Sequence, residues 1–173
     1  MNALVENNLQ IALPPNAAGR KFDDNTAHGL SHCMKAVDFI VELKDRLLFV
    51  EIKDPDQPGA TAERRETFIE RFLSGKLDAS LKVKYRDSWL YEWAHGRVNK
   101  PVTYLVLLGA STLSDAELLT RTDALKRQLP VLGPNAQPWN KSFVEGCAVL
   151  NLEAWNKALP CLLYTSPSPR DCS

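Results

Sequence analysis

Two neighbouring stretches of strand-forming sequence, separated by a short polar turn, constrain this chain more than any other feature. In residues 36–43 every second side chain from Val37 onward is apolar, which is the period of a half-buried β-strand. Residues 47–53 form a second apolar stretch, and Lys44 and Asp45 lie in the gap between the two. This arrangement predicts an antiparallel β-hairpin with a two-residue turn.

The turn fixes which residues face each other across the hairpin. In the predicted register Phe39 lies opposite Val50, so the apolar sets of the two strands share one face. The same register places Asp38 opposite Glu51, and a shift by one residue would mix the faces. Lys53 follows Glu51 by two residues and therefore lies on the same side of its strand. The hairpin is thus predicted to gather two carboxylates and an ammonium.

Two carboxylates on directly opposed strand positions have Cβ atoms about 4.5–5.5 Å apart and repel each other unless a cation lies between them. Hard oxygen ligands without nearby His or Cys favour Mg²⁺ or Mn²⁺. Lys53 could orient an attacking water and stabilise charge on a phosphate. The competing interpretation is a solvent-facing strand side that carries ordinary charges, with Glu51 paired to a lysine across the strands.

Asp38, followed after twelve residues by Glu51-Ile52-Lys53 on the next strand, resembles the signature of the PD-(D/E)xK, or restriction-endonuclease-like, nuclease superfamily. Val37 stands where the first proline of that signature would be, at a position where the superfamily is permissive. The resemblance implies that Asp38, Glu51 and the backbone carbonyl of Ile52 bind the metal, and that Lys53 serves the water nucleophile. It also implies an αβββαβ core.

The remaining patterns agree with an α/β fold that has a central mixed sheet of about four strands flanked by helices. An apolar side chain every four residues from Leu77 to Trp93 predicts a core-facing helical stripe, and Ser114 with Glu117 predicts a capping box. The expected elements are a short helix over 3–11, a short strand at Phe22, helices over 61–75 and 76–94, an interior strand over 102–109, a helix over 114–128, a strand over 143–152 and a helix from Glu153.

Members of the superfamily often add a carboxylate from the N-terminal helix. Glu6 fits that role by position, with Asp23 as its competitor for a metal contact. The competing interpretation makes Glu6 a solvated helix residue.

Polar residues of the helix over 76–94 are candidates for contact with nucleic acid. Lys84 and Ser88 share one face, because four residues make about one turn, and either could meet a phosphate. Lys82 and Arg86 could neutralise further DNA phosphates. The alternative is a solvated helix face.

The end of the chain departs from the pattern before it. Residues 161–171 contain two Ser-Pro steps and no core-forming period, and they resemble one reading frame of a transposase adapter used in preparing sequencing libraries. We therefore expect a single domain over residues 1–160 and a non-native or disordered tail over 161–173. On this interpretation the natural sequence continues beyond Pro160.

Composition narrows the class of protein. The chain has 173 residues, 21 basic and 21 acidic, and no apolar run near the ~20 residues of a membrane span, so a cytoplasmic globular protein is expected. Residues 60–100 are mildly basic, with 9 basic and 6 acidic side chains. The four cysteines are too sparse for a disulfide scaffold. His28, His32 and Cys33 have no second ligand pair, which argues against structural zinc.

Two functions fit these observations. The first is a Mg²⁺-dependent nuclease that hydrolyses phosphodiester bonds, with DNA as the expected substrate and RNA not excluded. The second is a catalytically inactive module of the same fold that binds DNA or protein in a defence or repair complex. Either could act as a homodimer or with a partner protein. A dinucleotide-binding enzyme is disfavoured because the chain has neither G-x-G-x-x-G nor a P-loop.

Overall fold

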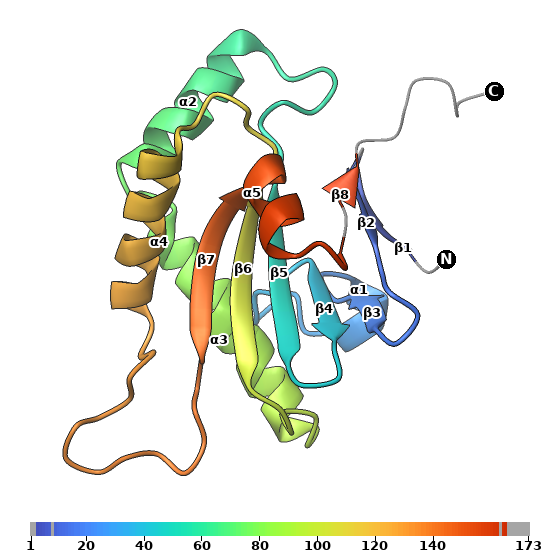
Figure 1. Ribbon diagram of the computed structural model, residues 1–173, viewed down its shortest axis with the longest axis vertical. Coiled ribbons are helices and arrows are strands. Elements are labelled where there is room, and N and C mark those ends of the chain that lie inside the picture. Colours follow the sequence, from blue (N-terminus) through green and yellow to red (C-terminus); the bar gives the residue numbers. More distant parts are fainter. Residues whose placement is uncertain (1–2, 8, 163, 166–173) are drawn as a thin grey trace.

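The structure, a computed structural model, describes residues 3–7, 9–162 and 164–165 and has an α/β architecture (Figure 1). Its elements are β1 (Ala3–Glu6), β2 (Leu9–Ala12), β3 (Ala18–Lys21), α1 (Asn25–His28), β4 (Phe39–Glu42), β5 (Leu47–Lys53), α2 (Ala62–Leu73), α3 (Asp78–Ala94), β6 (Val102–Leu108), α4 (Asp115–Gln128), β7 (Gly146–Asn151), α5 (Leu152–Ala158) and β8 (Tyr164–Thr165).

The central sheet has five strands in the order β3-β4-β5-β6-β7. The first three strands are antiparallel, and β5, β6 and β7 run parallel, so the sheet is mixed. Phe39 pairs with Val50 and Val41 with Leu48, which confirms the predicted hairpin register. The predicted interior strand is also confirmed, since β6 lies between β5 and β7 and is buried except at Thr103.

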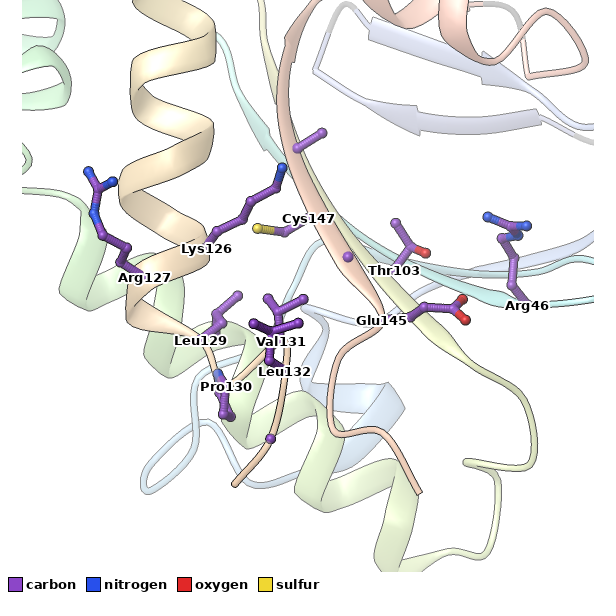
Figure 2. Close-up of a pocket in the computed structure, with 13 residues that line it drawn as sticks. Arg46, Thr103, Lys126, Arg127, Leu129, Pro130, Val131, Leu132, Glu145 and Cys147 are labelled. Carbon is purple, nitrogen blue, oxygen red and sulfur yellow. The ribbon is translucent and has the colours of Figure 1, made fainter. Parts of the chain in front are cut away.

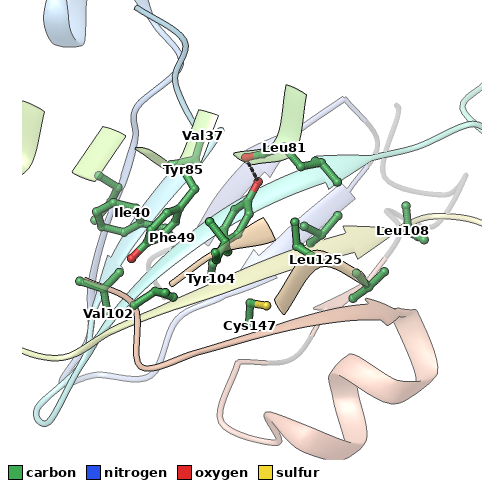
Figure 3. Packing of buried hydrophobic residues seen from close by; sticks show 14 of the residues in the cluster. Val37, Ile40, Phe49, Leu81, Tyr85, Val102, Tyr104, Leu108, Leu125 and Cys147 are labelled. Carbon is green, nitrogen blue, oxygen red and sulfur yellow. Dashed lines mark hydrogen bonds between the residues drawn. The ribbon is translucent and has the colours of Figure 1, made fainter. Parts of the chain in front are cut away.

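Both faces of the sheet are covered. Helices α2, α3 and α4 pack on one face, around a core that includes Phe49, Tyr85 and Tyr104 (Figures 1 and 3). There the Tyr104 hydroxyl donates a hydrogen bond of 3.1 Å to the Leu81 carbonyl, which ties β6 to α3 (Figure 3). The hairpin of β1 and β2 and helix α5 cover the other face, where Trp155 is fully buried.

The N-terminal segment is a β-hairpin, so the predicted helix over 3–11 is wrong. Strands β1 and β2 pair antiparallel, and Asn7 turns the chain with φ 52°. Asparagine tolerates this left-handed conformation better than most residues. Leu9 and Ile11 are buried at alternate positions of β2, as in a strand. The strand has only four residues, so this alternation cannot be distinguished from a helical pattern in the sequence.

Two predictions about burial need correction. Strand β4 is buried on both faces and not on one, because Ile40 packs under α3 while Phe39 and Val41 pack on the opposite face. The apolar stripe of α3 is core only in part. Tyr85 is fully buried, but Trp93, in the last turn of the helix, is 56% exposed.

Helix α4 lies along β7, the last strand of the sheet. Its N-terminus has the predicted capping box between Ser114 and Glu117. In the middle of the helix, the Thr122 hydroxyl accepts a hydrogen bond of 2.9 Å from the N–H of Val149. That N–H belongs to the outer edge of the sheet, where no further strand pairs with β7 among the described residues.

Part of the segment expected to be a tail packs on the fold. Leu162 is fully buried, its carbonyl accepts the indole N–H of Trp155 at 2.6 Å, and β8 pairs with β2. These contacts differ from the expected appendage over 161–173, while residues 163 and 166–173 lie outside the described residues. None of the described helices combines the length and the apolar character that crossing a bilayer requires.

Candidate active site

Asp38 stands where β4 begins and is held from two directions. Its backbone carbonyl accepts a hydrogen bond of 2.8 Å from the N–H of Phe22, and its Oδ2 accepts one of 2.6 Å from the N–H of Ile52. The side chain thus takes the place of a ladder partner at the end of the hairpin. Because the N–H and C=O of one strand residue point to the same edge, the Ile52 carbonyl faces this edge as well.

Glu51 projects from β5 toward α3 and is completely buried. Its Oε1 accepts hydrogen bonds from two ammonium groups, Lys53 Nζ at 2.5 Å and Lys84 Nζ at 2.8 Å. Its Oε2 is buried and has no hydrogen-bond partner among the described residues. Lys53 keeps 32% of its side chain exposed, so its ammonium lies between the buried carboxylate and the surface.

Lys84 of α3 brings the carboxylates together. Its Nζ lies 2.8 Å from Glu51 Oε1, 3.8 Å from Asp38 Oδ1 and 3.4 Å from Asp23 Oδ2. Asp38 and Glu51 therefore converge on one cation, as the hairpin register predicted. Lys84 itself was expected to contact phosphate, and helical phase alone gave no sign that it would enter this cluster. We call these residues, Asp23, Asp38, Glu51, Lys53 and Lys84, the carboxylate–lysine cluster.

Burial dominates the electrostatics of the cluster. It raises the pKa of Asp38 from 3.8 to about 7, with help from the like charge of Glu51 and against the opposing effects of Lys84, the Ile52 N–H and Lys53. Burial works against the charge of Lys84 too, but Glu51 and Asp38 outweigh it and hold the pKa of Lys84 above its ordinary value. Burial therefore makes the ionised form of Asp38 costly below about pH 7, and a cation that compensates its charge would favour that form.

The donors of this site suit a divalent cation with oxygen ligands. Three oxygen atoms here are hard ligands: Glu51 Oε2, Asp38 Oδ1 and the Ile52 carbonyl oxygen. Glu51 Oε2 also lacks the hydrogen-bond partner that buried carboxylate oxygens normally have. Within the described part of the chain, no group of three or more His, Cys, Asp or Glu side chains is arranged to hold a metal. Two carboxylates and a carbonyl would leave further positions to water and phosphate oxygens, as Mg²⁺ prefers.

The other candidate residues lie outside the cluster. Ser88 is fully buried, where its hydroxyl accepts from the Val37 N–H at 2.9 Å and donates to the Lys84 carbonyl at 2.7 Å. It positions the backbone before Asp38, and its burial leaves no room for the phosphate contact expected of it. Lys82 donates to Gln128 on α4, and Arg86 contacts Asp87 on the surface.

Glu6 lies on strand β1 and not on a helix. Its carboxylate accepts a hydrogen bond of 2.8 Å from Lys21 Nζ. The charge of Lys21 also acts on Asp38, so Glu6 borders the cluster through this lysine. The structure gives Asp23, its competitor in sequence, the direct contact with Lys84.

Two pockets lie near the ends of the sheet. One of about 490 Å³ borders Ile52 and Lys53 and adjoins the cluster. A larger pocket of about 960 Å³ lies at the opposite end of the parallel strands, between α4 and the beginning of β7 (Figure 2). Lys126, Arg127 and Cys147 line it, and none of the carboxylates of the cluster does. Size alone therefore does not identify the chemically distinctive site.

Comparison of the chain with protein-family models, with curated proteins and with solved structures gives no match. The functional argument therefore rests on the residues and on their geometry.

Proposed function

We propose that this protein is a Mg²⁺- or Mn²⁺-dependent nuclease with a PD-(D/E)xK-like core, hydrolysing phosphodiester bonds, with DNA as the first substrate to test. One observation carries the proposal. Glu51 is a fully buried carboxylate with an unpaired oxygen, and it lies beside Asp38 and two lysines at the end of a strand. In a purely structural ion pair, both buried oxygens of the carboxylate are expected to have partners. A carboxylate that binds a metal keeps an oxygen available for the ion.

Each residue of the cluster has a role in this proposal. Asp38, Glu51 and the Ile52 carbonyl would hold the ion. Bound there, a divalent cation supplies charge that polarises a phosphate and makes a water more acidic. Lys53, one-third exposed, orients the attacking water and offsets negative charge on the phosphate. Lys84 fixes the Glu51 carboxylate by its 2.8 Å contact and acts as a positioning residue.

The test is a cleavage assay on plasmid and single-stranded DNA and on RNA, with Mg²⁺, with Mn²⁺ and with EDTA. We expect cutting that requires the metal, and we expect Asp38→Asn and Lys53→Ala to abolish it. Lys157→Ala is the matched control, because Lys157 is an exposed lysine of α5, on the opposite face of the sheet from the cluster. Cutting that survives in EDTA, or that persists in both variants, would contradict the proposal.

A second candidate is the inactive binding module, and Lys84 is the observation that favours it. Its ammonium already lies within ion-pair distance of three carboxylates and could neutralise them permanently. This candidate predicts salt-sensitive binding of nucleic acid, or binding of a protein, without any cleavage. It also predicts that Mg²⁺ leaves the melting temperature unchanged.

A further inference from the structure

The pocket beside Lys53 has walls from three parts of the chain that are distant in sequence. The β1–β2 turn contributes Asn7, the end of β5 contributes Ile52 and Lys53, and the segment from Asp54 to Phe68 contributes the rest. Its volume of about 490 Å³ lies in the range of small-ligand sites.

The charge of this pocket suits an anion. Arg64 is exposed at the start of α2, and the described contacts include no ion pair for it, whereas its neighbour Arg65 is paired with Asp56 at 2.5 Å. Lys53 supplies a second cation from the end of β5. Asp54 is the acidic lining residue. Its Oδ1 is turned to the N–H of Asp56 at 3.1 Å, and burial raises its pKa.

The same pocket offers a flat apolar surface. Phe68 is half-buried, and its ring is stacked on Phe72 with 6.2 Å between centroids and 6° between planes. Phe72 is fully buried, so the stack anchors the orientation of Phe68 in the core. Pro55 and Pro58 stiffen the wall, because proline fixes φ. A rigid aromatic ring close to Arg64, for which the described contacts include no ion pair, and to Lys53, which is paired with Glu51 at 2.5 Å, is a combination that can bind a base together with its phosphate.

We propose that this pocket binds one unpaired nucleotide beside the phosphodiester that is cut. Arg64 and Lys53 hold its phosphate and Phe68 stacks on its base, so the substrate is single-stranded nucleic acid or a frayed end. A base inside an intact duplex is stacked and hydrogen-bonded, and it enters such a pocket only after leaving the helix. This inference rests on the proposed nuclease function, because it names the substrate of that same site.

The test separates binding from cleavage. A labelled single-stranded oligonucleotide and the duplex of the same sequence are titrated in EDTA by fluorescence anisotropy, with a mononucleotide and inorganic phosphate as competitors. We expect the single strand to bind more tightly than the duplex. We also expect the mononucleotide to compete better than phosphate, because the base adds stacking on Phe68.

The variants are Arg64→Ala and Phe68→Leu, with Arg127→Ala, at an exposed arginine in the last turn of α4, as the matched control. Arg64→Ala should weaken binding about tenfold and lower the salt slope by about 0.7, the loss of one phosphate contact. Phe68→Leu keeps an apolar side chain and should weaken the single strand about fivefold with no change in the salt slope.

Equal binding by Arg64→Ala and Arg127→Ala, or a duplex that binds as tightly as the single strand, would overturn the inference even if Mg²⁺-dependent cleavage is found. Conversely, binding that depends on Arg64 and Phe68 without cleavage in Mg²⁺ would support the pocket and refute the nuclease. The two proposals therefore fail by different results.

Discussion

Replacing Asp38 by Asn should stabilise the protein increasingly as the pH rises. Burial raises the pKa of Asp38 from 3.8 in the unfolded chain to about 7 in the fold. A raised carboxyl pKa means that the folded state favours the protonated form, so the native protein loses stability between pH 3.8 and about 7. Asn keeps an acceptor for the Ile52 N–H and does not ionise.

The magnitude follows from proton linkage. With these two pKa values, the cost of ionising Asp38 grows by about 2 to 3 kcal/mol between pH 5 and pH 8. For a chain of this size the difference in melting temperature between Asp38→Asn and the wild type should widen by roughly 4–12 °C over that interval.

The assay is thermal or urea unfolding of both proteins in EDTA from pH 5 to pH 8, at constant ionic strength. The difference between the two proteins cancels the titrating groups that do not interact with Asp38, so it reports on Asp38 and its coupled neighbours in the cluster. A difference that stays flat with pH, or that favours the wild type as the pH rises, would refute the burial argument.

Three further outcomes are expected. At pH 8, Mg²⁺ should raise the melting temperature of the wild type but not of Asp38→Asn; an ion present at 100 times its dissociation constant stabilises by about 2.7 kcal/mol. Lys84→Met should destabilise the protein by about 3 kcal/mol in EDTA, because the buried Glu51 carboxylate then loses its contact with the Lys84 ammonium. Mg²⁺ should stabilise this variant by more than it stabilises the wild type. Ser88→Ala should cost about 1–3 kcal/mol in urea unfolding, because the Val37 N–H then has no acceptor in the interior; a loss near zero would show that water replaces the hydroxyl.

Where the sequence carries a strong period, it predicts the fold well. The hairpin of β4 and β5, the interior strand β6 and the capping box of α4 follow from alternation, from an unbroken apolar run and from the Ser114–Glu117 spacing. The N-terminal hairpin was missed because its two strands have only four residues each, too few to distinguish the alternation of a strand from the period of a helix. Asn7 carried the available signal, since asparagine is common in tight turns.

The candidate site was predictable only within the hairpin. Asp38, Glu51 and Lys53 lie on adjacent strands, so their proximity follows from local register. Lys84 reaches them from α3, and its place depends on how that helix packs across the sheet, which no local pattern determines. Ser88 shows the same limit, because helical phase gives its face but not that the face is buried.

The hydrogen bond from the Val149 N–H to the Thr122 hydroxyl has a consequence for how the molecule behaves in a crowded solution. An open strand margin can recruit a strand from another molecule and begin aggregation. By capturing a donor in the middle of β7, α4 interrupts the row of groups that such a visiting strand would need. Helix α4 and the Thr122 hydroxyl together thus oppose the addition of another strand to β7. A variant that lost this contact would be more prone to self-association, independently of any catalytic activity.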